Sequence, residues 1–124
     1  MNALDKANVL KERTKQFAIR IVAVSRSLPR SREADVVGKQ LLRSGTAVAA
    51  NYRAVCRARS KAEFVSKMSI VVEEADETVF WLELLGDTGL APTAKLALLL
   101  KEANELLAIC AASLRTAKYN NSAV

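Results

Sequence analysis

The chain has 124 residues, of which 51% are hydrophobic and 26% are charged, a composition typical of a globular domain rather than a disordered segment. No apolar run approaches the ~18 residues that a membrane span needs, and the N-terminus lacks the apolar region of a secretory signal, so we expect a cytoplasmic protein with no membrane partner. Histidine is absent, which excludes Ser-His and Cys-His catalytic pairs and most zinc sites.

The net charge of +6 is divided unevenly along the chain. Residues 1–61 hold fourteen Lys and Arg against four Asp and Glu, whereas residues 62–124 hold five against nine. This division indicates either a nucleic-acid surface or self-association through complementary faces.

Two helices are predicted in the first half of the chain. In the first, over residues 8–28, apolar residues recur at helical spacing until Pro29 ends the pattern: Leu10, Phe17, Ile21, Val24 and Leu28. The second, over residues 32–56, has Ser31 as its N-cap and one stripe of Val37, Leu41, Ser44, Val48, Asn51 and Val55. Its middle is nearly all small residues, which lets a neighbouring helix approach closely, and Gly45 there implies a packing reason.

Two further helices are predicted in the second half. A capping box of Ser60 and Glu63 begins the third, over residues 61–86, whose seam is Phe64, Met68, Val71, Ala75, Thr78, Leu82 and Leu85. Gly86 and Gly89 mark its end. The fourth, over residues 92–118, has Pro92 in its first turn and a stripe of Leu96, Leu99, Ala103, Leu107, Cys110 and Leu114, followed by a frayed tail.

Four long helices with short connections predict a single all-α domain over residues 1–124, an antiparallel up-down four-helix bundle. The first and third helices carry more apolar residues than one buried face needs: Ile19 and Val22 in the first, and Val65, Ile70, Val72, Val79, Trp81 and Leu84 in the third. A central position in a small bundle is one explanation, and burial between subunits of a homo-oligomer is the better one.

Several residue groups have both a chemical and a structural interpretation. The acidic cluster at Glu73, Glu74, Asp76 and Glu77 is interpreted as a solvated or interface face that pairs with the basic half of a neighbouring subunit, rather than as a metal site. Ser44, Thr46 and Asn51 are interpreted as back-bonding hydroxyls and a buried Asn that fixes helix register, rather than as an active site.

Cysteines and aromatic residues also favour structural roles. Cys56 and Cys110 both lie inside apolar helical patterns, so we expect reduced, buried core residues. Trp81 is expected in the core or at a subunit interface, and Phe80 is the aromatic residue best placed for exposure. We therefore predict no catalytic residue, no metal, no cofactor and no enzymatic activity.

The segment from Gln40 to Leu85, together with Phe17 to Pro29, resembles the bacterial four-helix-bundle family also called the S23 or 23S rRNA intervening-sequence protein family. The resemblance depends on Gln40-Leu41-Leu42-Arg43-Ser44, Ala50-Asn51, Arg57 to Ser60 with Glu63-Phe64, and Glu74-Ala75 with Glu77. It implies a homopentamer of antiparallel bundles. The family is similar in fold to the accessory variability determinant of diversity-generating retroelements, a basic pentamer that binds nucleic acid and a reverse transcriptase. Many relatives have Glu where this chain has Ala54.

The basic residues carry the functional prediction. In an up-down bundle the connection between the second and third helices lies at the same end as the start of the first helix and the end of the fourth. The predicted nucleic-acid-binding residues are Arg57, Arg59, Lys61, Lys11, Lys118, Arg115, Arg43 and Arg53. We therefore expect a homo-oligomer, with a pentamer favoured by the resemblance, that binds RNA or DNA through phosphates. The alternative is a structural adaptor whose oligomer surface docks a partner protein, such as a reverse transcriptase, without binding nucleic acid.

Overall fold

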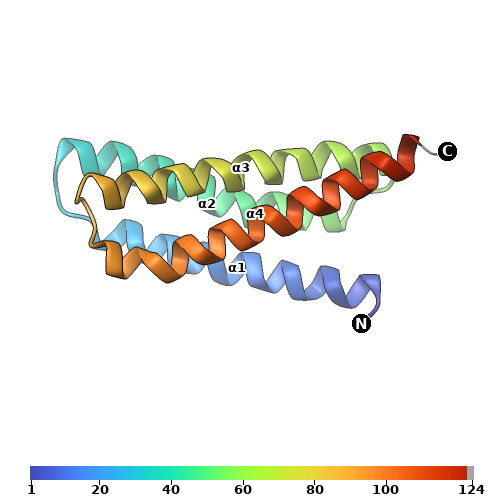
Figure 1. Cartoon of the computed structure of the whole chain (residues 1–124), viewed down its shortest axis with the longest axis horizontal. Helices are drawn as coiled ribbons and strands as arrows, with labels where there is room; N and C mark the ends of the chain where they lie inside the picture. Colours follow the sequence, from blue (N-terminus) through green and yellow to red (C-terminus); the bar gives the residue numbers. More distant parts are fainter. Residues whose placement is uncertain (123–124) are drawn as a thin grey trace.

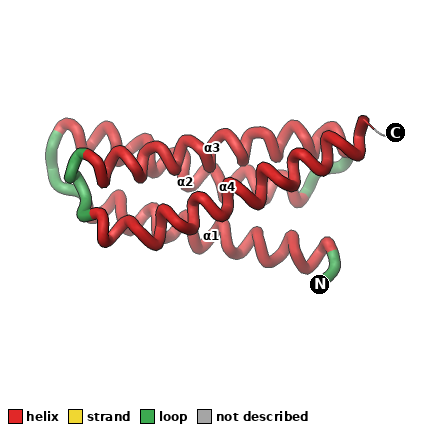
Figure 2. The backbone as a smooth tube through the Cα atoms, viewed as in Figure 1, coloured by secondary structure: helices red, strands yellow, loops and turns green. Residues whose placement is uncertain are grey.

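The computed structural model describes residues 1–122, and within them the chain forms four helices: α1 (Ala3–Ser27), α2 (Arg32–Cys56), α3 (Lys61–Asp87) and α4 (Thr93–Ser122). Figure 1 shows them running up and down in turn, with both chain ends and the α2–α3 connection at one end of the bundle. The α1–α2 and α3–α4 connections lie at the other end, and Figure 2 shows that the connections are short and that no strand is present in the described part of the chain. The predicted all-α up-down bundle is confirmed.

Polar side chains cap the first three helices. Asn2 Oδ1 accepts from the Asp5 amide at 2.8 Å, and Ser31 Oγ accepts from the Ala34 amide at 3.1 Å. Ser60 Oγ accepts from the Glu63 amide at 3.1 Å, which is one half of the predicted capping box. The Glu63 carboxylate instead lies 3.7 Å from Arg59 Nε.

Helix boundaries differ from the prediction mainly at the two ends of the chain. α1 begins five residues before the expected start, where Asn2 caps it. The prediction missed these first turns because their apolar side chains are exposed and form no buried stripe. α4 is helical as far as Ser122 instead of ending at 118, and residues 123–124 of the expected tail lie outside the described residues. Gly89, with a φ of +73°, takes the left-handed conformation that ends α3.

The core forms where the predicted stripes meet. The α3 seam is confirmed from Met68 to Leu85, and Phe17 and Ile21 of α1 are buried in a core cluster with residues of the other three helices. Two stripes are confirmed except at one position each: Tyr52 rather than Asn51 is buried in α2, and Leu106 is more deeply buried than Leu107 in α4. Cys110 is buried as predicted. The prediction for Cys56 was wrong, because Val55 takes the core position and leaves Cys56 exposed.

Small residues set the distance between α1 and α2. A Cβ built on Gly45 would lie 2.7 Å from Ile21 Cγ2, so only glycine allows this approach. α2 and α3 are joined by buried hydroxyls, because Thr78 Oγ1 lies 2.9 Å from Ser44 Oγ and 2.7 Å from the Glu74 carbonyl oxygen. This pair, and not Asn51, links the two helices: Asn51 is half-buried and donates to the Ala47 carbonyl of its own helix at 2.9 Å.

Candidate nucleic-acid interface

Two carboxylates of α4 neutralise the charge of Arg13. Its Nε and Nη2 each donate to the Glu102 carboxylate at 2.7 Å, and Nη2 also donates to Glu105 at 2.6 Å. The hydrogen bond to Glu102 raises the pKa of Arg13, and the same bond lowers the pKa of Glu102. This two-pronged pairing ties α1 to α4 and removes Arg13 from the cations available to a ligand.

Two carboxylates of α3 neutralise the charge of Arg43. Its Nη1 donates to Glu74 at 2.9 Å and its Nη2 donates to Glu77 at 2.5 Å, while Trp81 Nε1 donates to Glu77 at 3.1 Å. The hydrogen bond from Arg43 lowers the pKa of Glu77. Glu74 and Glu77, which were predicted to lie on a solvated or interface face, thus bind a cation of their own chain. Although Arg43 is among the predicted nucleic-acid-binding residues, the structure places it in an intramolecular network.

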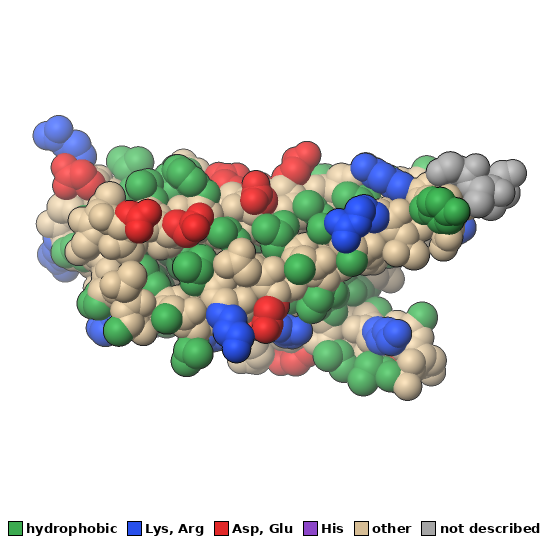
Figure 3. All heavy atoms as spheres, in the orientation of Figure 1, with side chains coloured by type: hydrophobic (Ala, Val, Ile, Leu, Met, Phe, Trp, Pro, Cys, Tyr) green, Lys and Arg blue, Asp and Glu red, His purple; other side chains and the backbone are tan. Residues whose placement is uncertain are grey.

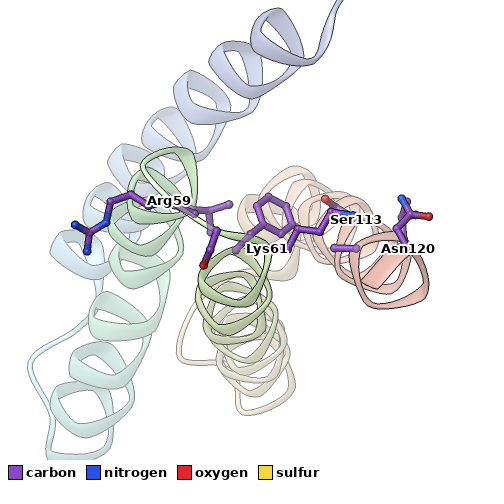
Figure 4. A pocket seen from close by; sticks show the side chains of 10 residues that line it. Arg59, Lys61, Ser113 and Asn120 are labelled. Carbon is purple, nitrogen blue, oxygen red and sulfur yellow. The ribbon is translucent and has the colours of Figure 1, made fainter. Parts of the chain in front are cut away.

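The α2–α3 connection carries three exposed cations. Arg57 is the C-cap of α2, Lys61 begins α3, and Arg59 lies between them with a single 3.7 Å contact to Glu63. Arg59 and Lys61 help to line a pocket of about 650 Å³ against the end of α4. In Figure 4 the Arg59 side chain extends away from Ser113 and Asn120, and it is 89% exposed. The long exposed Arg59–Glu63 pair contributes little, so all three cations remain accessible.

The remaining predicted cations do not gather into one cluster. Arg115 and Lys118 are exposed near the end of α4, which shares its end of the bundle with the connection, as expected. Figure 1 shows the start of α1 diverging from the end of α4 at this end. Lys11 lies in a separate groove between α1 and α2, which no residue of α4 lines.

That groove is basic. It has a volume of about 480 Å³ and is lined by Lys11, Lys15 and Arg53 over a floor of small α2 residues, with Glu12 at its margin. Within residues 1–122 none of these three cations forms an ion pair. Lys11 and Arg53 were predicted from sequence and Lys15 was not, although its position one helical turn after Lys11 signals the same face.

Acidic side chains are concentrated along one edge of the bundle, whereas basic side chains are spread more widely. On the face shown in Figure 3, acidic side chains follow the upper edge, and basic side chains lie at both ends and at the lower middle, the end where α3 begins included. The same view shows a hollow between the start of α1 and the rest of the bundle. This apolar groove, of about 490 Å³, is lined by residues that include Leu10, Phe64, Met68 and Ile109.

The hydroxyl groups considered as candidates for an active site have structural roles instead. Ser44 is fully buried, and Thr46 Oγ1 donates to the Leu42 carbonyl at 2.7 Å. Burial raises the pKa of the Cys110 thiol to about 11, which suppresses the reactive thiolate. Over residues 1–122 no group of three or more Asp, Glu or Cys side chains is arranged to hold a metal ion. None of the helices in this part of the chain combines the length and hydropathy of a membrane span.

Comparisons with known proteins agree on one family. Residues 6–112 match the family described as 23S rRNA-intervening sequence protein. A solved structure of a protein of unknown function from the S23 ribosomal protein family of Bacteroides thetaiotaomicron is 34% identical, with a TM-score of 0.81, over 89% of this chain and 98% of that chain. No curated protein matches the chain.

Proposed function

Since the chain belongs to the 23S rRNA-intervening sequence protein family, we propose that it is a non-catalytic, oligomeric protein that binds nucleic acid through backbone phosphates. The observation that carries the proposal is the pairing pattern of its charges. Carboxylates bind Arg13 and Arg43. In contrast, the cations of the groove between α1 and α2 and those of the α2–α3 connection face solvent without strong partners. Unpaired, exposed cations attract a polyanion such as nucleic acid.

The chemistry of the side chains favours phosphate contacts over base reading. Arg57, Arg59 and Arg53 present planar guanidinium groups, which match phosphate oxygens in a two-pronged fashion. None of the described helices carries a recognisable base-reading motif. The protein therefore tolerates many sequences and loses affinity steeply as salt rises.

Self-association is part of the proposal. Large apolar side chains remain exposed on a single subunit, among them Leu4, Val9, Ile19, Ile70 and Phe80. The apolar groove beside α1 adds a concave surface of the same chemistry. Contacts of this kind bury apolar area when subunits join, and we favour a pentamer because of the family resemblance.

A matched pair of charge reversals tests the proposal. Arg57→Glu combined with Arg59→Glu should weaken binding of labelled RNA and DNA alike and reduce the salt slope by about 2. Lys95→Glu combined with Lys101→Glu changes the net charge equally, at exposed α4 positions outside every predicted site, and should bind almost as well as the wild type. A wild-type protein that binds no nucleic acid at ~50 mM salt would overturn the proposal.

An adaptor that docks a protein partner is the second candidate. The apolar groove favours it, because its floor of Leu10, Phe64 and Met68 suits an apolar partner surface. If the wild type fails to bind nucleic acid but still assembles, the adaptor becomes the better account.

A further inference from the structure

A second basic groove lies between α1 and α2 at the far end of the bundle. It has a volume of about 310 Å³ and is lined by Arg26, Arg30 and Lys39, with Asp35 as its acidic member. Within residues 1–122 none of the three cations forms an ion pair. Ser25 also contributes to the lining of this groove, although its Oγ is buried and has no hydrogen-bond partner in the described structure. The groove is thus a second cluster of three cations.

The two basic grooves belong to one continuous face. Lining residues of α2 recur at steps of three and four along a single stripe: Lys39, Leu42, Thr46, Ala49 and Arg53. Neither groove includes a residue of α3 or α4, so both open on the outer side of the α1–α2 pair. We call this the α1–α2 face. Its two ends are basic, and its middle is uncharged.

The separation of the two clusters follows from helix geometry. Lys15 and Arg26 are eleven residues apart on α1, and Lys39 and Arg53 are fourteen apart on α2. At 1.5 Å per residue these intervals correspond to about 16 and 21 Å. A duplex rises about 3.4 Å per base pair, so the clusters span about five to six base pairs.

The face lacks the feature that single-stranded ligands require. Proteins that bind single strands stack the bases on exposed aromatic side chains. The aromatic residues of α1 and α2, Phe17 and Tyr52, are buried, and the exposed ones, Phe80 and Tyr119, lie on α3 and α4. A duplex keeps its bases stacked internally and offers only phosphates to such a face.

We propose that the α1–α2 face is a binding site for double-stranded nucleic acid, with Lys11, Lys15 and Arg53 on the phosphates at one end and Arg26, Arg30 and Lys39 on those at the other. The proposal rests on the proposed function and deepens it, since it names the face, the strandedness and the minimum length of the ligand. Thr46 Oγ1 is already committed to the Leu42 carbonyl, so the cations carry the contact.

The test measures affinity for RNA and DNA hairpins with stems of about 4 and about 8 base pairs; the shorter stem spans about 14 Å, which is less than either interval between the clusters. We expect wild-type protein to bind the longer stem at least tenfold more tightly than the shorter one. Arg26→Glu with Lys39→Glu should abolish that advantage, and Lys11→Glu with Arg53→Glu should do the same. Lys95→Glu with Lys101→Glu is the control of equal charge and should retain it. Equal affinities for RNA and DNA stems would show that the shared phosphate backbone is recognised. A higher affinity for one of them would show that the protein recognises the helical form of that duplex.

Three results would overturn this proposal without touching the proposed function: equal wild-type affinity for both stems, unchanged length dependence in both face variants, or tighter binding of an unpaired strand of the same length. Failure of the wild type to bind any nucleic acid at low salt would instead remove the proposed function itself. Circular dichroism of each variant confirms that a lost advantage does not come from unfolding.

Discussion

Gly45 is the residue at which close helix packing depends on a missing side chain. A Cβ there would meet the β-branched Ile21 at 2.7 Å, and a second Ile21 atom at 2.8 Å. Alanine normally stabilises a helix by about 1 kcal/mol relative to glycine, but overpacking costs about 1–3 kcal/mol. We therefore expect Gly45→Ala to lower the free energy of unfolding, measured by urea denaturation.

Gly38 provides the matched comparison. A Cβ at this position would lie 3.0 Å from Leu28 Cδ1, the flexible end of a half-buried side chain. Gly38→Ala should therefore be neutral or stabilise the protein by up to about 1 kcal/mol. Equal effects of the two substitutions would contradict the account of α1–α2 packing.

Carboxylates that bind arginine make stability dependent on pH. The hydrogen bond from Arg13 holds the pKa of Glu102 below its usual range, and that from Arg43 does the same for Glu77. Their stabilising contribution is complete above the pKa of the unfolded chain and is lost as pH falls through the lower pKa of the folded state. We expect the free energy of unfolding to decrease from pH 7 to pH 3.

The Glu102 substitution isolates that contribution. Glu102→Gln should show a smaller loss of stability on acidification than the wild type, because the titrating group is gone. Glu83→Gln removes an exposed carboxylate on α3 that has no ion pair within residues 1–122, and its acid profile should follow the wild type. If the free energy of unfolding changed with pH in the same way in all three proteins, the Arg13–Glu102 pair would not contribute to stability.

At the scale of single helices, α3 shows most clearly how burial sets stability. Leu82 is 1% exposed in the core, whereas Leu98 on α4 is 73% exposed. Leu82→Ala should lower the free energy of unfolding by ~2–5 kcal/mol, and the same change at Leu98 by less than ~0.5 kcal/mol, as measured by chemical denaturation. Similar losses of unfolding free energy at the two sites would contradict the burial of Leu82 in the core.

Helix periodicity predicts these elements well where one face is buried. The α2 range was predicted to the residue, and the α3 range to within one residue, because a polar cap and an unbroken stripe mark them. The start of α1 was missed, because Leu4 and Val9 are exposed in the single subunit and produce no stripe. Tyr52 was missed as a core residue because its neighbour Asn51 fits the same spacing to within one position.

At the scale of the whole molecule, topology was easier to predict than charge pairing. The up-down order correctly placed the α2–α3 connection beside both chain ends. Sequence alone could not reveal that Arg43 binds Glu74 and Glu77, since these partners are more than thirty positions away along the chain. It also could not separate Lys11 from the end of α4, because the divergence of α1 depends on side-chain packing across the bundle.

Assembly is a prediction for the whole molecule. We expect light scattering at micromolar concentration and moderate salt to give a multiple of the 13.5 kDa subunit mass, with five subunits favoured. Ile109→Glu places a charge beside the apolar groove and should reduce the mass while leaving the helical circular dichroism spectrum intact. A monomeric wild type would contradict the oligomer.

Salt dependence of binding tests the central claim, that unpaired cations bind backbone phosphates, more directly than any single substitution. The affinity of the wild type for an RNA or DNA duplex would be measured between ~50 and ~200 mM salt and plotted on logarithmic axes. Neutralising three phosphates gives a slope of about −3 and neutralising six gives about −5, so a straight line between these values is predicted for one subunit's face, and a steeper one if several subunits share the duplex. A slope near zero, or no binding at the lowest salt, would contradict the account.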